Sequence, residues 1–276
     1  MVLRTLLALL AIPLILTATA FGQEGQGGVT DREGGTEEIE TDRDSFTPAT
    51  SVAGRSRVIY EAAYSFIDNR RVDDTHSYPE FIARMGLTDT IELRVGWNYE
   101  VGGAGSPVSG NVPDDFEAEP ELERASRILY GGKIWLTSQS GWRPQSSIIV
   151  QGFTPTSGKS SSTDFSVTPV VGWQLARGWT WDSGLRYATS SLEDDHFNTW
   201  SPSTVLKVPL GERWKAHVEY FGTFSDGRAK ETVVQFVSPG VHYLINANTE
   251  VGVRAGWGLN DQTPNFFTNV GIGYRY

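Results

Sequence analysis

The sequence predicts an all-β protein: a transmembrane antiparallel up-and-down β-barrel of about 12 strands, preceded by a disordered acidic N-terminal leader. Three observations predict this fold. Apolar and polar residues alternate with a period of two from residue 57 onwards. Aromatic residues lie at the ends of the apolar faces. The connections are mostly short at one end and longer at the other, which is the asymmetry of outer-membrane barrels.

Composition excludes several other classes. Among the 276 residues, 23 Lys and Arg stand against 33 Asp and Glu, and the net charge of −10 argues against a nucleic-acid binder, which needs a basic face. The absence of cysteine excludes disulfide scaffolds, cysteine-based zinc sites and cysteine nucleophiles. The mean hydropathy of −0.29 disfavours a helical membrane bundle but suits a barrel, because half of each strand faces a polar lumen.

Residues 1–20 have the features of a secretory signal peptide. Arg4 gives a basic start, an apolar run follows over 6–16, and small residues lead to Ala20, the predicted cleavage position. The alternative is an uncleaved membrane anchor, but the apolar run is about half the roughly 20 residues of a spanning helix and Pro13 interrupts it. We therefore expect the mature chain to begin near Phe21 and to work outside the cytoplasm.

Residues 21–55 are predicted to form a disordered acidic periplasmic leader. They contain a glycine-rich stretch and an acidic run from Glu33 to Asp44, with almost no periodic apolar residues. Such a segment cannot bury enough surface to offset the entropy cost of ordering. The alternative interpretation is a plug inserted in the lumen, which no apolar pattern supports. The barrel is expected over residues 56–276.

Residues 91–100 illustrate the strand pattern. Ile91, Leu93, Val95, Trp97 and Tyr99 are apolar, and every residue between them is polar or glycine. This alternation predicts a strand with one apolar face and has no helical alternative. Most of the predicted strands are near the 9–11 residues that cross a bilayer at a tilt. The same reasoning predicts strands at 57–67, 78–87, 90–100, 124–136, 146–154, 164–175, 179–190, 199–208, 213–225, 232–244, 250–258 and 266–276.

The apolar face is predicted to meet lipid. Trp97, Trp173 and Trp214 are examples of flanking aromatics that are typical of a membrane–water interface. The polar face carries many full charges that a soluble core would not tolerate. Longer connections such as 101–123 and 190–198 alternate with tight ones such as 176–178, and twelve strands place both termini on the short-turn, periplasmic side. The predicted location is the bacterial cell outer membrane, with its lipid as one partner.

The last strand carries the most specific signal. Val270, Ile272, Tyr274 and Tyr276 alternate with polar residues and glycine, and the chain stops on the aromatic Tyr276. An alternating strand closed by an aromatic resembles the signal that the barrel-assembly machinery of diderm bacteria reads. The alternative is an ordinary last strand. We expect these four residues to act as the assembly signal, with that machinery as a partner during biogenesis.

A family resemblance rests on short motifs. The tight turn Gly-Leu-Thr-Asp at 86–89 is followed by Glu92-Leu93-Arg94, and further matches lie at 153–158, 218–222 and 240–260. Over residues 78–276 the chain resembles the outer-membrane family described as "Putative MetA-pathway of phenol degradation", a group of transporter-like barrels. Met85 stands where an aromatic is expected, and 156–158 has one residue more than the family's Pro-Thr-Gly. The resemblance implies transport, with aromatic or other hydrophobic compounds as the suggested permeant.

The polar face is expected to line the lumen. Its charges mix both signs, so neighbouring strands can pair Glu92 with Arg84, or Asp182 with Lys207. One interpretation is structural, with ion pairs that stiffen the wall; the other is a charged constriction that selects permeants. We expect a narrow channel or transporter for small solutes, with a small-molecule permeant and no nucleic-acid partner. The lumen-lining candidates are Arg84, Glu92, Arg94, Asp182, Arg186, Lys215, Glu219 and Arg254.

Two other functions stay open. An omptin-like protease is one alternative, because Asp194-Asp195-His196 and Asp73-Asp74 with His76 lie in predicted extracellular loops and could activate water. Acidic, solvated loop tips are the simpler explanation of these residues. A structural barrel without transport is the other alternative. The sequence shows no metal cluster, phosphate-cradling loop or dinucleotide fingerprint, so we expect no enzyme, no cofactor, and no catalytic or metal-binding residue.

Overall fold

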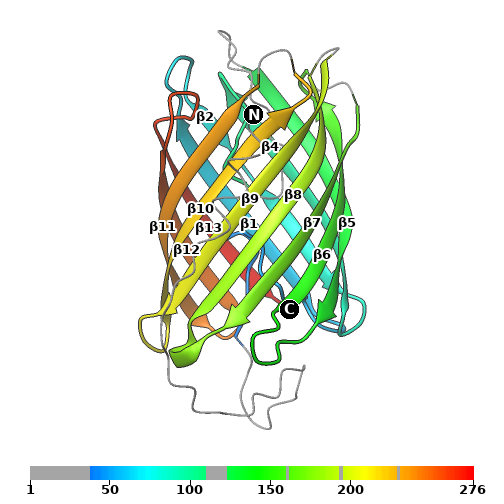
Figure 1. Ribbon diagram of the computed structural model, residues 1–276, viewed down its shortest axis with the longest axis vertical. Helices are drawn as coiled ribbons and strands as arrows, with labels where there is room; N and C mark the ends of the chain where they lie inside the picture. The colour runs from blue at the N-terminus through cyan, green and yellow to red at the C-terminus, as the bar shows by residue number, and fades with distance from the viewer. Residues whose placement is uncertain (1–37, 110–122, 160–161, 193–194, 229–230) are drawn as a thin grey trace.

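The computed structural model describes residues 38–109, 123–159, 162–192, 195–228 and 231–276, which form an all-β barrel of tilted strands (Figure 1). Among these residues, no helix is long and apolar enough to cross a membrane. The elements are β1 Val58–Asp68, β2 Thr75–Ser77, β3 Phe81–Gly86, β4 Ile91–Gly102, β5 Glu123–Thr137, β6 Gln145–Ser157, β7 Asp164–Gln174, the 3₁₀ turn η1 Ala176–Gly178, β8 Thr180–Leu192, β9 Asp195–Pro209, β10 Trp214–Asp226, β11 Val233–Asn246, β12 Thr249–Gly258 and β13 Phe266–Arg275.

The barrel closes because the first and last strands pair. β13 runs antiparallel to β1 from Ile59↔Arg275 to Asp68↔Phe266, and the remaining strands follow one another in antiparallel order around the wall. β2 and β3 each pair with both β1 and β4, so they are two pieces of one interrupted strand. The wall therefore has twelve strands, and the predicted closed antiparallel barrel is confirmed.

The two faces of the wall have opposite chemistry. On β4, Leu93, Val95 and Trp97 are 41%, 45% and 40% exposed, while Glu92 and Arg94 are at most 1% exposed. Successive side chains of a strand point to opposite faces. The apolar face is therefore the outside of the barrel, and the charged face surrounds the lumen.

The connections also differ between the two ends. The end that carries the C-terminus has the short connections 87–90, 175–179, 210–213 and 247–248, together with the longer 138–144. At the opposite end, the prediction of a long loop over residues 190–198 is wrong. In the structure, β8 pairs with β9 as far as Leu192↔Asp195. The strands continue there because polar side chains are tolerated on both faces of a hairpin once it extends past the apolar band.

Candidate functional site

The lumen is occupied by residues 38–55, which we call the lumen segment. Ile39 N donates to Ala247 O at 2.9 Å at the short-connection end. Ile39 and Ala53 belong to one buried cluster with Ile59 and Leu244. The two ends of the segment therefore lie side by side, and the residues between them rise into the barrel and return, as the blue trace inside the strands shows (Figure 1).

The lumen segment corrects the expectation of a disordered leader over 21–55. Residues 41–43 and 45–47 are buried, and the segment folds back on itself: Asp42 Oδ1 accepts a hydrogen bond from Ala49 N at 3.1 Å, and the Ser51 hydroxyl donates to Glu40. Polar partners on the wall order these residues, and an apolar pattern does not reveal such partners. Residues 21–37 and the predicted signal peptide 1–20 lie outside the described residues.

Asp42 lies in a buried cluster of charges. Arg94 Nη1 is 2.6 Å from Asp42 Oδ2, and Lys133 Nζ is 3.4 Å from the same oxygen. Arg84 lies 3.6 Å from it and also pairs with Glu61 and Glu92, each at 3.0 Å. We call this set the charged cluster; it comprises Asp42, Glu61, Arg84, Glu92, Arg94 and Lys133.

Among the described residues, the wall by itself gives the charged cluster one more cation than carboxylates. It supplies three cations, from Arg84, Arg94 and Lys133, and two carboxylates, and Asp42 supplies the third. Removing one partner from a buried ion pair costs several kcal/mol, so Asp42 completes this site. Burial by itself would raise the pKa of Asp42, but the nearby Arg84, Lys133 and Arg94 outweigh it and hold that pKa well below its usual range.

Asp44 makes a second charged contact. Lys207 Nζ of β9 lies 2.6 Å from Asp44 Oδ2. Asp182 is the partner expected for this lysine from the sequence, and the structure pairs it with Asp44 of the lumen segment. Burial would raise the pKa of Asp44, but Lys207 outweighs it and lowers the pKa to about 2. At the rim, Lys215 Nζ pairs with Glu38 at 2.8 Å.

The tip of the lumen segment is held by one carboxylate and one ring. Glu219 of β10 accepts hydrogen bonds from Phe46 N at 3.0 Å and from Thr47 N and Oγ1 at 2.6 and 2.7 Å. The Phe46 ring stacks on Phe221, with centroids 4.5 Å apart and planes at 6°. This ring belongs to what we call the aromatic cluster, which comprises Phe46, Phe221, Phe236 and Phe267. The cluster packs with Ile67, Val108 and Val234.

A second insertion meets the lumen segment from the other end. After β4, residues 105–109 are buried, and Val108 joins the aromatic cluster. Arg254 of β12 joins the two insertions, because its Nη1 donates to Glu219 at 3.1 Å and its Nη2 to Val108 O at 2.6 Å. The middle of the lumen is therefore packed from both sides.

The wall from β6 to β9 has a different lining. Five buried hydroxyl and amide groups on these strands have no hydrogen-bond partner among the described residues: Ser147 Oγ, Gln151 Nε2, Ser166 Oγ, Ser190 Oγ and Thr199 Oγ1. Buried polar groups without a protein partner bind water. A small pocket lies between Phe46 and Pro48 of the lumen segment and this wall. We call this side of the lumen the hydroxyl-lined wall, and its polar groups are suited to bind water.

Seven of the eight predicted lumen-lining residues are buried on the inner face, each at most 3% exposed. Arg84, Glu92 and Arg94 meet in the charged cluster, and Arg186 lies over the Phe46 ring at 5.0 Å. The Asp182 carboxylate fills the space where a Cβ at Gly172 would lie. Lys215 is the exception, because its side chain is 32% exposed at the rim.

Sequence reasoning missed the residues that come from the lumen segment. Asp42, Asp44 and Phe46 lie in a stretch without strand periodicity, and their partners on the wall are up to 173 residues away. One signal was available: the acidic run sits next to a barrel whose inner face includes several buried cations.

A family model described as "Putative MetA-pathway of phenol degradation" matches residues 41–276. The chain belongs to this family. The match begins inside the lumen segment, so most of that segment is part of what the family model describes. The predicted resemblance, which was based on residues 78–276, is confirmed over a longer range.

Several solved structures align with this chain. An outer-membrane channel from Pseudomonas putida F1 aligns with a TM-score of 0.59 and 10% identity, covering 86% of this chain and 100% of that one. The translocator domain of the autotransporter NalP from Neisseria meningitidis gives 0.48 and 12% identity, covering 81% and 89%. The channel DcaP of Acinetobacter baumannii gives 0.35 and 12%, covering 82% and 100%. Among curated proteins nothing matches. This member of the family is a bacterial outer-membrane β-barrel, as predicted, and it shares its fold with the Pseudomonas putida channel.

Proposed function

We propose that this barrel is a narrow channel for small solutes, which the lumen segment closes and its displacement opens. The observation that carries the proposal is the way the segment is held. The twelve strands pair only with one another, whereas Asp42 and Asp44 bind the wall through side chains and the backbone of the tip binds the Glu219 carboxylate. The segment can therefore leave without breaking the wall.

The solute route runs along the hydroxyl-lined wall of β6 to β9. The pocket between this wall and the lumen segment includes Gln151, Thr168 and Ser201. Hydroxyl and amide groups that bind water in the closed state can bind a polar solute in the same positions. Small hydrophilic solutes are the permeants that this lining suits.

A second permeant class, aromatic compounds, is favoured by one observation. The Phe46 ring lies stacked on Phe221, with the Arg186 guanidinium over it. Once Phe46 leaves, these two side chains offer a flat apolar face and a cation to another ring. The family description, with its reference to phenol degradation, points to the same class.

We propose transport rather than catalysis. Asp195 of the predicted Asp-His couple is paired with Arg228 at 3.0 Å. His76 of the second couple is bound to the Tyr64 hydroxyl at 2.7 Å, in a solvent-exposed position. Asp194 lies outside the described residues. Both contacts support a structural role for these side chains.

We also propose that the last strand directs assembly. Val270, Ile272 and Tyr274 of β13 are 53%, 49% and 46% exposed, and Tyr276 is 83% exposed. Their exposure on the outer face leaves them accessible to the barrel-assembly machinery. The same proposal places the short connections on the periplasmic side, from which the lumen segment enters.

The test is single-channel recording in a planar lipid bilayer. We expect purified mature protein to be mostly closed, and a variant lacking residues 38–54 to conduct in steady steps several times larger. The matched control lacks residues 21–37, a deletion of the same length, and should behave as the wild type. A folded variant without residues 38–54 that stays silent would contradict the channel. Liposome uptake of a small sugar and of a phenol then separates the two permeant classes.

A further inference from the structure

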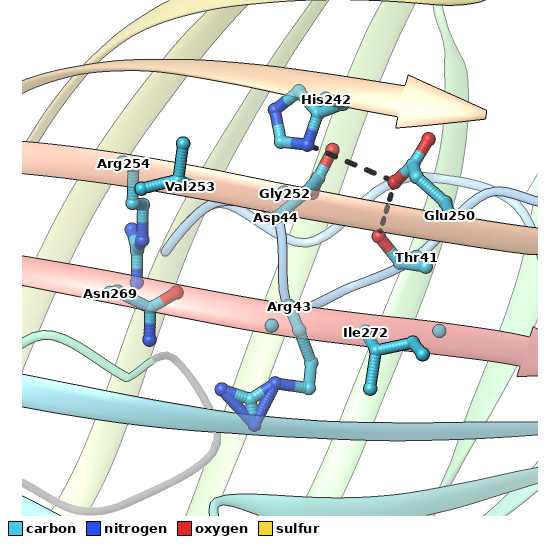
Figure 2. Close-up of a pocket in the computed structure, with 12 residues that line it drawn as sticks. Thr41, Arg43, Asp44, His242, Glu250, Gly252, Val253, Arg254, Asn269 and Ile272 are labelled. Carbon is cyan, nitrogen blue, oxygen red and sulfur yellow. Dashed lines mark hydrogen bonds and ion pairs between the residues drawn. The ribbon is translucent and has the colours of Figure 1, made fainter. Parts of the chain in front are cut away.

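Three metal-binding side chains meet where the lumen segment touches the wall. Asp44 comes from the segment, His242 from β11 and Glu250 from β12, and one donor atom of each lies within 4.8 Å of the other two. They line a small pocket together with Thr41 and Arg43. Figure 2 shows the His242 ring and the Glu250 carboxylate joined by a dashed line, with the Asp44 side chain close to both.

The imidazole of His242 has one nitrogen without a partner. His242 Nε2 lies 2.6 Å from His217 Nδ1, which is a hydrogen bond. His242 Nδ1 has no hydrogen-bond partner among the described residues, although the side chain is only 3% exposed. Its nearest charged atom is Glu250 Oε1 at 3.8 Å, beyond hydrogen-bond distance. If Nε2 donates to His217, the Nδ1 lone pair faces carboxylate oxygens, and a cation bound between them satisfies all three groups.

Distances and charge both allow a cation here. Donor atoms around a tetrahedral zinc ion, bound at about 2.0–2.2 Å, lie roughly 3.3 Å apart, so side-chain rotations of about an ångström close the site. Asp44 and Glu250 bring two negative charges against one from Lys207. The other nearby cations are already engaged: Arg43 with Glu80, Arg254 with Glu219 and Lys215 with Glu38.

We propose that Asp44, His242 and Glu250 bind a divalent first-row transition metal, such as zinc, that fastens the lumen segment to the wall. One imidazole and two carboxylates are ligands that such ions accept, and water from the pocket completes the coordination. His217 is then a positioning residue, because its hydrogen bond fixes which nitrogen of His242 faces the metal. The sequence predicts no metal site, because the three donor residues are separated by up to 206 positions and form no spacing motif.

Zinc binding to metal-stripped, detergent-folded full-length protein tests the site without any channel recording. We expect one equivalent per chain in a chelator-competition titration, and a Co²⁺ absorption spectrum typical of nitrogen and oxygen ligands. Glu250→Gln and Asp44→Asn should each weaken zinc binding at least about 10-fold, and His242→Ala about 100-fold. Lys207→Met should strengthen binding, because the ammonium no longer competes for Asp44. His196→Ala, which removes an exposed histidine of β9, is the matched control and should bind as the wild type.

Two results would overturn the metal site: no stoichiometric zinc binding by the wild type, or equal binding by the wild type and the folded Glu250→Gln variant. Heat-modifiable gel mobility establishes folding of each variant. If zinc also keeps the wild type closed in bilayers but not Glu250→Gln, the metal regulates the proposed channel. That second readout rests on the proposed function, whereas the titration does not.

Discussion

The charged cluster and the aromatic cluster hold the same lumen segment by different physics. In the first, Asp42 neutralises an excess cation of the wall through atoms 2.6–3.6 Å apart. In the second, the Phe46 ring is buried against Phe221. Ion pairs depend on the protonation of each partner and carry specificity, whereas apolar burial depends on area and packing. The comparison teaches that one contact is sensitive to charge and pH, while the other resists both.

Removing Asp42 should break the contact between the lumen segment and the charged cluster. Of the changes considered, it should weaken docking of the segment most. Asp42→Ala removes the buried carboxylate that Arg84, Arg94 and Lys133 share, which costs about 4 kcal/mol of segment docking. Because the chain has no cysteine, a Pro48→Cys reporter measures docking through its rate of maleimide labelling. We expect labelling about 1,000-fold faster than in the reporter alone. An unchanged rate would show that Asp42 does not hold the segment.

Removing the Phe46 ring should have the second-largest effect on docking of the lumen segment. Phe46→Ala deletes the side chain that stacks on Phe221 and costs about 3 kcal/mol, so labelling of the same reporter should rise about 100-fold. Phe46→Leu, which keeps most of the apolar area, is the control and should restore most of the protection. Salt should leave the effect of Phe46→Ala unchanged. A strong dependence on salt would show that the two clusters are not separable.

Acidification should weaken a second charged contact of the lumen segment, the ion pair between Asp44 and Lys207. The pKa of Asp44 is lowered to about 2 in the folded protein, and an unfolded aspartate titrates near 4. A lowered folded pKa gives stability that is present above about pH 4 and is lost as the pH falls toward 2. The loss is about 2 kcal/mol, so labelling of the reporter with an acid-compatible thiol reagent should rise about 30-fold between pH 5 and 2. Asp44→Asn should flatten this rise; an equal rise in both proteins would refute the assignment to Asp44.

The smallest effect is expected from one hydroxyl. Thr47→Val keeps the shape of the side chain but removes the Oγ1 hydrogen bond of 2.7 Å to Glu219. The remaining donors from Phe46 N and Thr47 N still satisfy that carboxylate, so about 1 kcal/mol is lost. Labelling of the Pro48→Cys reporter should rise about fivefold. A change as large as that of Phe46→Ala would mean that Glu219, and not the ring, fixes the tip.

The wall could be predicted from the sequence because its order is local. Leu93, Val95 and Trp97 face lipid while Glu92 and Arg94 face the lumen, so each strand carries its own alternation. Strand ends were less predictable: β9 begins at Asp195, four residues before the predicted 199, because its polar start resembles a loop. The lumen segment could not be predicted, because the partners of Asp42 and Phe46 lie 52 and 173 residues away along the chain. Its order arises only after the wall exists.

The place of the lumen segment next to β1 has a consequence for biogenesis. The segment leads directly into β1, and β1 is the strand that seals the wall against β13 through the Ile59 to Asp68 register. A chain cannot be threaded sideways through a closed antiparallel sheet, and the segment is bonded inside the finished barrel to β9 and β10. Both ends of the segment lie at the short-connection end, so the segment can enter the lumen through that end after the seam has formed. The wall is then complete before its lumen is filled, and docking of the segment is the last step of assembly.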